Sequence, residues 1–232
     1  MSESQGESNG TPRAVLWDVD GTLIDSAEYH WLTWRETLSG EGYELTRAQF
    51  DASFGRRNDE ILRGYFGENL PAHEVARIGE AKEVRYRELV VARGIEPLPG
   101  ARRWLEKLKA EGWRQALASS APRLNLEAIL KALGLEEFFD AVASAEDVER
   151  GKPDPQIFLA AAAKVGVPAA RCVVVEDAPA GVEAARRAGM RRVGVLSSHV
   201  ALDADVVVNS LADLPEDTFD RLLGGRRVIH LT

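Results

Sequence analysis

The sequence contains very little cysteine. Cys172 is the only one among 232 residues, so no disulfide can form within the chain, and such sparing use is typical of a reducing compartment. Long apolar runs are also missing, since no stretch approaches the roughly 20 residues that a membrane-spanning helix needs. The first residues, MSESQGESNGTPR, lack the apolar segment of a signal peptide. These absences favour a cytoplasmic protein that has no membrane partner.

An excess of basic residues is absent too. Lys and Arg number 29 against 37 Asp and Glu, which gives a formal net charge of -8 and a pI of about 5.2. A protein that binds a nucleic acid usually presents a basic face, so nucleic acid is not an expected partner. A small anionic substrate stays compatible with this charge, because a local metal ion or lysine can override it. No feature of the sequence specifies an oligomeric state.

What the sequence does contain is typical of a globular protein: 45% hydrophobic and 28% charged residues, enough for a sizeable core. Short apolar runs alternate with helical patterns from Ala101 onward. The runs read as strands are AVLW, RQALASS, CVVVED, RRVGVLSS and ADVVVNS, and the clearest helices are RLNLEAILKALG and PAGVEAARRAGM. Such alternation predicts an α/β protein with a doubly wound, mostly parallel sheet.

Residues 27–97 follow a different pattern. They carry helical periodicity in HWLTWRETL, DEILRGYF and AKEVRYRELVVARG, they lack a convincing strand, and EPLPG closes the segment as a rigid connector. The sequence therefore predicts an α/β core made of residues 1–26 and 98–232, in which residues 1–12 form a floppy leader. Residues 27–97 are predicted to form an inserted all-α domain.

Polar residues follow three of the predicted strands and one proline turn. They are Asp18 and Asp20 in AVLWDVDGTLIDS, Ser119 and Ser120 in ALASS, Glu176 and Asp177 in VVVED, and Lys152 in GKPDP. Because parallel sheets bind ligands at the carboxyl ends of their strands, we expect these side chains to meet. A calcium loop is a poor alternative, since Gly21 comes too early for that pattern and a strand precedes it.

This set of residue types suits phosphoryl transfer. Clustered carboxylates are hard oxygen ligands for Mg²⁺, one carboxylate can be a nucleophile, and a second can transfer protons. A serine, a lysine and helix N-terminal amides can hold the charge on phosphoryl oxygens. Each residue alone has an ordinary structural explanation, such as a helix cap for the serines or a solvated lysine. Their combination favours catalysis.

Four segments resemble the four motifs of the haloacid dehalogenase superfamily, most of whose members are Mg²⁺-dependent phosphatases. They are DVDGT, Ser119, Lys152 in GKPDP, and EDAPAG, and the resemblance runs from Ala14 to about Leu214. The segment DSAEYHWLTW is similar to the entry into the helical cap of the β-phosphoglucomutase-like and phosphoglycolate phosphatase-like branch. The resemblance implies a Rossmann-like core with an inserted helical cap.

The resemblance also implies roles for individual residues. Asp18 would be the nucleophile and a metal ligand, and Asp20 the acid/base, whose backbone carbonyl also reaches the metal. Ser119 and Lys152 would complete the catalytic set, and Glu176 and Asp177 would complete the Mg²⁺ site. The residues expected to bind substrate are Gly21, Thr22, Ser120, His30, Arg56 and Arg57. His30 and the two arginines also have structural explanations, as a buried core histidine and as a solvated helix start.

Several reactions occur in this superfamily. Asp20, Glu176 and Asp177 argue against a dehalogenase, and Lys82, the one lysine of the helical segment, is a poor match for a phosphonatase. Asn58, Pro122 and Arg123 depart from the mutase pattern. The sequence thus predicts a phosphoric monoester hydrolase that acts on a small phosphorylated metabolite through an aspartyl-phosphate. A sugar-phosphate mutase and a non-catalytic binding module stay open, and sugar phosphates, phosphoglycolate and nucleotides all stay open as substrates.

Overall fold

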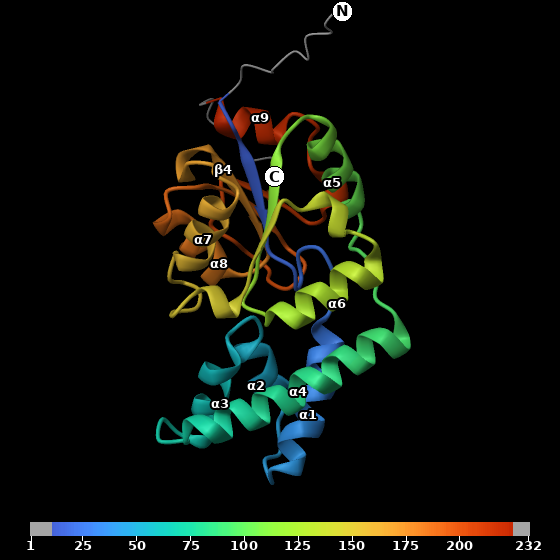
Figure 1. The fold of residues 1–232 in the computed structure, drawn as a ribbon, viewed down its shortest axis with the longest axis vertical. Helices are drawn as coiled ribbons and strands as arrows, with labels where there is room; N and C mark the ends of the chain where they lie inside the picture. The colour runs from blue at the N-terminus through green and yellow to red at the C-terminus, as the bar shows by residue number, and fades with distance from the viewer. Residues whose placement is uncertain (1–10, 225–232) are drawn as a thin grey trace, which may run out of the picture.

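A computed structural model describes residues 11–224 and contains a six-stranded sheet in which all neighbours are parallel (Figure 1). Its strands are β1 (Ala14–Trp17), β2 (Arg114–Ala118), β3 (Ala141–Ala143), β4 (Cys172–Glu176), β5 (Arg191–Val195) and β6 (Val206–Val208). The strand order is β3-β2-β1-β4-β5-β6. Since β1 lies between β2 and β4, the order reverses there, and this is where doubly wound sheets bind ligands.

Both faces of the sheet are covered by helices. The core helices are α5 (Ala101–Ala110), α6 (Arg123–Leu133), α7 (Gln156–Lys164), α8 (Pro179–Arg187) and α9 (Thr218–Leu223). All four residues of β1 are fully buried, with Val15 and Trp17 in one apolar cluster and Ala14 and Leu16 in the other. This two-sided burial explains why the strand is continuously apolar and confirms the predicted doubly wound α/β core.

Four helices lie beyond the carboxyl end of the sheet, at the foot of Figure 1. They are α1 (Ala27–Gly40), α2 (Arg47–Ser53), α3 (Asn58–Phe66) and α4 (Ala72–Arg93), and together we name them the cap. The cap has its own apolar cluster, built around Trp34, Leu38, Phe50 and Leu62. Its two connectors run side by side, because Ile24 bridges to Pro97 and the Leu98 amide donates to the Leu23 carbonyl at 2.8 Å.

Some elements differ from the sequence prediction. No helix was predicted for α2, α5, α7 or α9 and no strand for the three-residue β3, and β5 stops at Val195 although the predicted strand ran to residue 198. Short 3-10 turns, η1 (Glu136–Phe138), η2 (Ala145–Asp147), η3 (Ala169–Arg171) and η4 (Leu211–Asp213), lie in connections. Most of the predicted leader lies outside the described residues. Within residues 11–224, no helix has the length and apolarity to span a membrane.

Candidate active site at the carboxyl edge of the sheet

A tight turn follows β1 and sets the first two acids. The Asp18 amide continues the sheet by donating to the Val175 carbonyl at 3.0 Å, and the amides of residues 22–24 then all donate to the Val19 carbonyl. Gly21 has φ +87°, and a Cβ there would lie 2.1 Å from Asp177 Oδ2. Only glycine allows this turn to approach β4 so closely.

The Asp18, Glu176 and Asp177 carboxylates form a buried cluster whose oxygens lie within 4.8 Å of one another. Lys152 Nζ lies 2.6 Å from both Asp18 Oδ1 and Glu176 Oε1. Burial raises the pKa of Asp18 well above its usual value, with Lys152 opposing and the neighbouring acids adding to the effect. Burial and Glu176 raise the pKa of Asp177 to about 7. One ammonium cannot balance three carboxylates, so this oxygen set fits a hard divalent cation such as Mg²⁺.

Glu176 is held by the start of α8. Its Oε2 accepts a hydrogen bond from the Ala178 amide at 2.8 Å, while Oε1 contacts Lys152. A Cβ on Gly181 would lie 1.8 Å from Glu176 Oε1. The glycine of EDAPAG therefore makes room for a carboxylate, and Glu176 has fewer free oxygen positions for a metal than Asp18 and Asp177 have.

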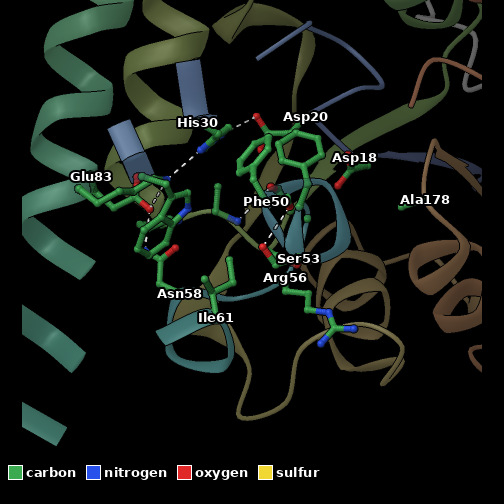
Figure 2. Close-up of a pocket in the computed structure, with 18 of the residues that line it drawn as sticks. Asp18, Asp20, His30, Phe50, Ser53, Arg56, Asn58, Ile61, Glu83 and Ala178 are labelled. Atoms are coloured by element: carbon green, nitrogen blue, oxygen red, sulfur yellow. Dashed lines mark hydrogen bonds and ion pairs between the residues drawn. The ribbon is translucent and has the colours of Figure 1, made fainter. Parts of the chain in front are cut away.

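The Asp20 side chain turns away from this cluster and toward the cap (Figure 2). Its Oδ1 accepts a hydrogen bond from the Ser26 hydroxyl and lies 3.3 Å from His30 Nε2. Burial acts to raise the pKa of Asp20, but His30, Ser26 and Lys82 outweigh it and hold the pKa below its usual value. Both contacts fall on Oδ1, and Oδ2 has no hydrogen-bond partner among residues 11–224.

His30 is oriented by Lys82, whose Nζ lies 2.8 Å from His30 Nδ1. An ammonium can only donate, so Nδ1 must be the acceptor and the ring proton is on Nε2, which faces Asp20. The His30 ring also stacks on Tyr86, with ring centroids 4.2 Å apart. His30 is thus a buried residue in contact with Asp20, which joins the two explanations that the sequence left open.

Ser119 follows β2 and is 2% exposed. Its Oγ accepts a hydrogen bond from the Ala121 amide at 3.1 Å, and α6 begins four residues later with Pro122 at its N-cap position. Ser119 is therefore not the cap of that helix, and its hydroxyl proton is available to a ligand. Ser119 and Ser120 line the same cavity as Asp18, Asp20 and Asp177.

The cavity lies between the core and the cap and has a volume of about 60 Å³. Its cap side is mixed: the apolar lining residues are Trp34, Phe50, Phe54 and Ile61, and the polar ones are His30, Ser53, Arg56, Asn58, Lys82 and Glu83. In Figure 2, Asp18 and Asp20 come from the core loop, while Phe50, Ser53 and Ile61 come from the cap. Two domains thus enclose one small site.

Some residues expected to bind substrate lie elsewhere. Arg57 does not line this cavity, because its Nη1 donates to the Val148 and Ala145 carbonyls at 3.0 and 3.3 Å and its Nε contacts Asp59. Gly21 and Thr22 line an adjoining cavity of about 560 Å³. That cavity shares only Phe50, Phe54 and His199 with the first.

Three residues of this region were missed at the level of sequence. His199 lines both cavities, and its Nδ1 lies 3.1 Å from the Asp177 carbonyl oxygen. Glu83 and Asn125 form a buried contact between the cap and the core, at 2.5 Å. Neither residue belongs to a motif, and only the fold brings them together.

Comparison with known proteins gives a consistent result. A family described as haloacid dehalogenase-like hydrolase matches residues 12–189. The chain is 35% identical over 218 residues to β-phosphoglucomutase of Bacillus subtilis, covering 87% of this chain and 91% of that protein. It is 32% identical over 214 residues to hexitol phosphatase B of Escherichia coli, covering 88% and 96%.

A solved structure, that of β-phosphoglucomutase from Clostridium difficile, superposes with a TM-score of 0.81 at 27% identity, covering 92% of this chain and 98% of the other. The family match over residues 12–189 includes all four of the motifs on which the resemblance was based. The chain belongs to the haloacid dehalogenase-like hydrolase family.

Proposed function

We propose that this hydrolase is a Mg²⁺-dependent phosphatase that cleaves a small phosphomonoester through an aspartyl-phosphate on Asp18. The observation that carries the proposal is that two neighbouring acids have different surroundings. Asp18 lies in the carboxylate cluster with Glu176 and Asp177, whereas Asp20 contacts His30 and Ser26 instead. Bound Mg²⁺, held by Asp18, Asp177, Glu176 and the Asp20 carbonyl, would supply positive charge to the phosphoryl oxygens.

In the first step, an Asp18 oxygen bonds to phosphorus as the ester bond breaks, and Asp20 gives its proton to the departing alkoxide. In the second step, Asp20 takes a proton from water, the water oxygen bonds to phosphorus, and Asp18 is released. The lowered pKa of Asp20 suits the base of the second step. An incoming phosphate dianion opposes ionisation of Asp20, which favours the acid of the first. Ser119 and Lys152 would hold the phosphoryl oxygens.

Hydrolysis is supported over a mutase reaction. A mutase must hold a second phosphate, yet Asn58 is bound to Glu83 at 2.6 Å, and Arg123 is bound to Asp147 at 2.6 Å. Pro122 has no N–H to offer. Among the Lys and Arg residues that line the cavity, Arg56 alone makes no side-chain hydrogen bond within the described chain. One free cation at the cavity suits a single anionic or polar feature of the leaving group.

The test is a phosphate-release assay on a panel of esters, with Mg²⁺ and after exhaustive chelation. The panel holds hexitol phosphates, fructose 1-phosphate, β-glucose 1-phosphate, phosphoglycolate and nucleoside monophosphates. We expect Mg²⁺-dependent release of phosphate and preference for a sugar or polyol phosphate, because the relatives include a hexitol phosphatase and a β-phosphoglucomutase. Isomerisation of β-glucose 1-phosphate without phosphate release would show a mutase instead. Inactivity on every ester, with retained Mg²⁺ binding, would indicate a binding module.

A further inference from the structure

The acid/base Asp20 is connected to a buried polar network that ends in the core. Glu83 of α4 accepts hydrogen bonds from Lys82 at 2.9 Å and Asn58 at 2.6 Å through Oε1, and from Asn125 at 2.5 Å through Oε2. Asn125 belongs to core helix α6 and is fully buried. One carboxylate therefore joins two cap helices to a helix of the core.

The Glu83 carboxylate also balances the charge of a buried lysine. The Lys82 and Glu83 side chains are only 2% and 3% exposed. A buried ammonium without a counter-ion is costly, and Glu83 supplies the counter-ion of Lys82 at 2.9 Å. The Lys82 ammonium also lies 5.3 Å and 5.2 Å from the centres of the Trp34 and Tyr86 rings. Charge, hydrogen bonds and aromatic faces thus hold this ammonium in one place.

The network has a direction. Asn125 and Asn58 donate to Glu83, Lys82 donates to Glu83 and to His30, and His30 donates to Asp20. Figure 2 shows the stretch from Asn58 and Glu83 to His30 and Asp20. Asn125 is itself oriented, because its Oδ1 accepts a hydrogen bond from Arg87 at 3.0 Å and its Nδ2 is thereby turned to Glu83. Each donor group of the network therefore has an acceptor, from α6 to Asp20.

We propose that Glu83 and Asn125 are positioning residues for proton transfer: the core amide holds the cap carboxylate, which holds Lys82 and His30 against Asp20 Oδ1. The inference rests on the proposed function of Asp20. The network crosses from α4 to α6 at Asn125, through its bonds with Glu83 and Arg87, so both bonds break when the cap moves away from the core. His30 then holds Asp20 in position only while the cap is closed on the core.

The test uses the leaving group. Departure of p-nitrophenolate needs no proton, whereas departure of a sugar alkoxide does, so only the second reaction depends on a well-placed Asp20. Single-turnover cleavage is measured for p-nitrophenyl phosphate and for the best alkyl phosphate of the panel, such as sorbitol 6-phosphate. The variants are Asn125→Ser and Glu83→Gln. Arg77→Gln, which removes ion pairs to Glu41 and Glu74 within the cap, is the matched control.

We expect Asn125→Ser to slow cleavage of the alkyl ester by about tenfold or more and to change cleavage of the aryl ester by less than about threefold, as selective loss of a general acid requires. With p-nitrophenyl phosphate in excess over enzyme, a burst of p-nitrophenolate should also appear, because the water-activating step slows. Arg77→Gln should leave both rates unchanged. Thermal unfolding of each variant shows whether it is folded. If Glu83→Gln does not fold, the test rests on Asn125→Ser, because that variant keeps the Lys82–Glu83 ion pair.

Equal loss with both esters would mean that Asn125 supports the fold rather than Asp20, and no loss with either would mean that the network is dispensable; both results overturn the inference. Neither touches the proposed function. That function fails separately, if the wild-type protein releases no phosphate from any ester or forms no phosphoenzyme.

Discussion

Asp18 and Asp20 are separated by one residue, yet the protein moves the pKa values of their carboxyls in opposite directions. Burial among two more acids raises the pKa of Asp18. Asp20 is buried as well, but the His30, Ser26 and Lys82 contacts outweigh burial and lower its pKa. On an extended strand residues i and i+2 would share a face, but β1 ends at Trp17 and the turn around the Val19 carbonyl directs Asp20 to the cap. Different surroundings for two similar acids are what a nucleophile and a proton carrier need.

Asn substitutions should separate these roles. Asp18→Asn removes the attacking oxygen, so no phosphoenzyme should form from any ester. Asp20→Asn keeps the backbone and the acid cluster, so Mg²⁺ affinity should change by less than about threefold while both half-reactions slow by roughly 10²-fold or more. Acid-quenched phosphoenzyme and isothermal titration with Mg²⁺ measure the two effects. A phosphoenzyme in Asp18→Asn, or normal turnover in Asp20→Asn, would refute the assignment.

Sequence motifs located the residues that lie at strand ends but did not distinguish neighbours. Arg56 and Arg57 look alike in FGRRNDEIL, yet only Arg56 lines the cavity, because the helical turn that starts at Asn58 directs Arg57 to the loop of residues 145–148. The contact between Glu83 and Asn125 could not be predicted from the sequence for another reason. Their contact joins positions 42 residues apart, and no local pattern encodes it.

Among the elements, β4 and α8 are joined by a close approach that can be tested. In a helix, Gly→Ala normally stabilises by about 1 kcal/mol. At Gly181 the added methyl would lie 1.8 Å from Glu176 Oε1, so the carboxylate must move and its contact with Lys152 must lengthen. We expect Gly181→Ala to weaken Mg²⁺ binding by about tenfold and to lower the melting temperature.

Gly64 of α3 is the matched control, because a Cβ there meets no atom within 4 Å. Gly64→Ala should keep Mg²⁺ affinity and keep or raise the melting temperature. If Gly181→Ala and Gly64→Ala change Mg²⁺ affinity and melting temperature alike, Gly181 is not needed to leave room for the Glu176 carboxylate.

Long periodic elements were predictable and short ones were not. The alternation of strands and helices after Ala101 is enough to predict the doubly wound core. In contrast, β3 has three residues and exists because β2 offers it a pairing edge. The seven residues of α2 did carry a local signal, since Thr46 and Gln49 form a capping box. That signal is weak without the tertiary contacts of Phe50 with the cap cluster.

At the scale of the whole molecule, Arg57 fastens the cap to the core by donating to two core carbonyls. Arg57→Ala removes both bonds and should raise KM for all esters by a similar factor of about three to ten, equivalent to roughly 1 kcal/mol of cap closure. Arg56→Ala should instead change the ratio of kcat/KM between anionic and neutral leaving groups. Identical substrate profiles for the two variants would show that the arginines are not divided between docking and recognition.

The uncompensated acid cluster also affects global stability. In the folded protein the pKa of Asp177 is about 7, against an ordinary value of 3.8, and that of Asp18 is raised in the same direction. At pH values between the ordinary and the raised pKa, the folded state holds more protons than the unfolded state, so the stability of the fold falls as pH rises. For Asp177 alone the full change across the window is on the order of 4 kcal/mol as an upper figure. The fold therefore carries an unfavourable charge at neutral pH unless a cation is bound.

We expect the chelated protein to lose thermal stability steadily from pH 5 to pH 8, and millimolar Mg²⁺ to restore it at pH 8 but to add little at pH 5, where protons occupy the same oxygens. Asp177→Asn removes one of the titrating groups, so the slope of melting temperature against pH should become shallower in the chelated protein, and the Mg²⁺ effect at pH 8 should shrink. Differential scanning fluorimetry across pH, with and without chelator, measures all of these quantities. A chelated wild-type protein whose stability rises toward pH 8 would mean that the acids are not held in excess charge, and the electrostatic argument for the metal would fall with it.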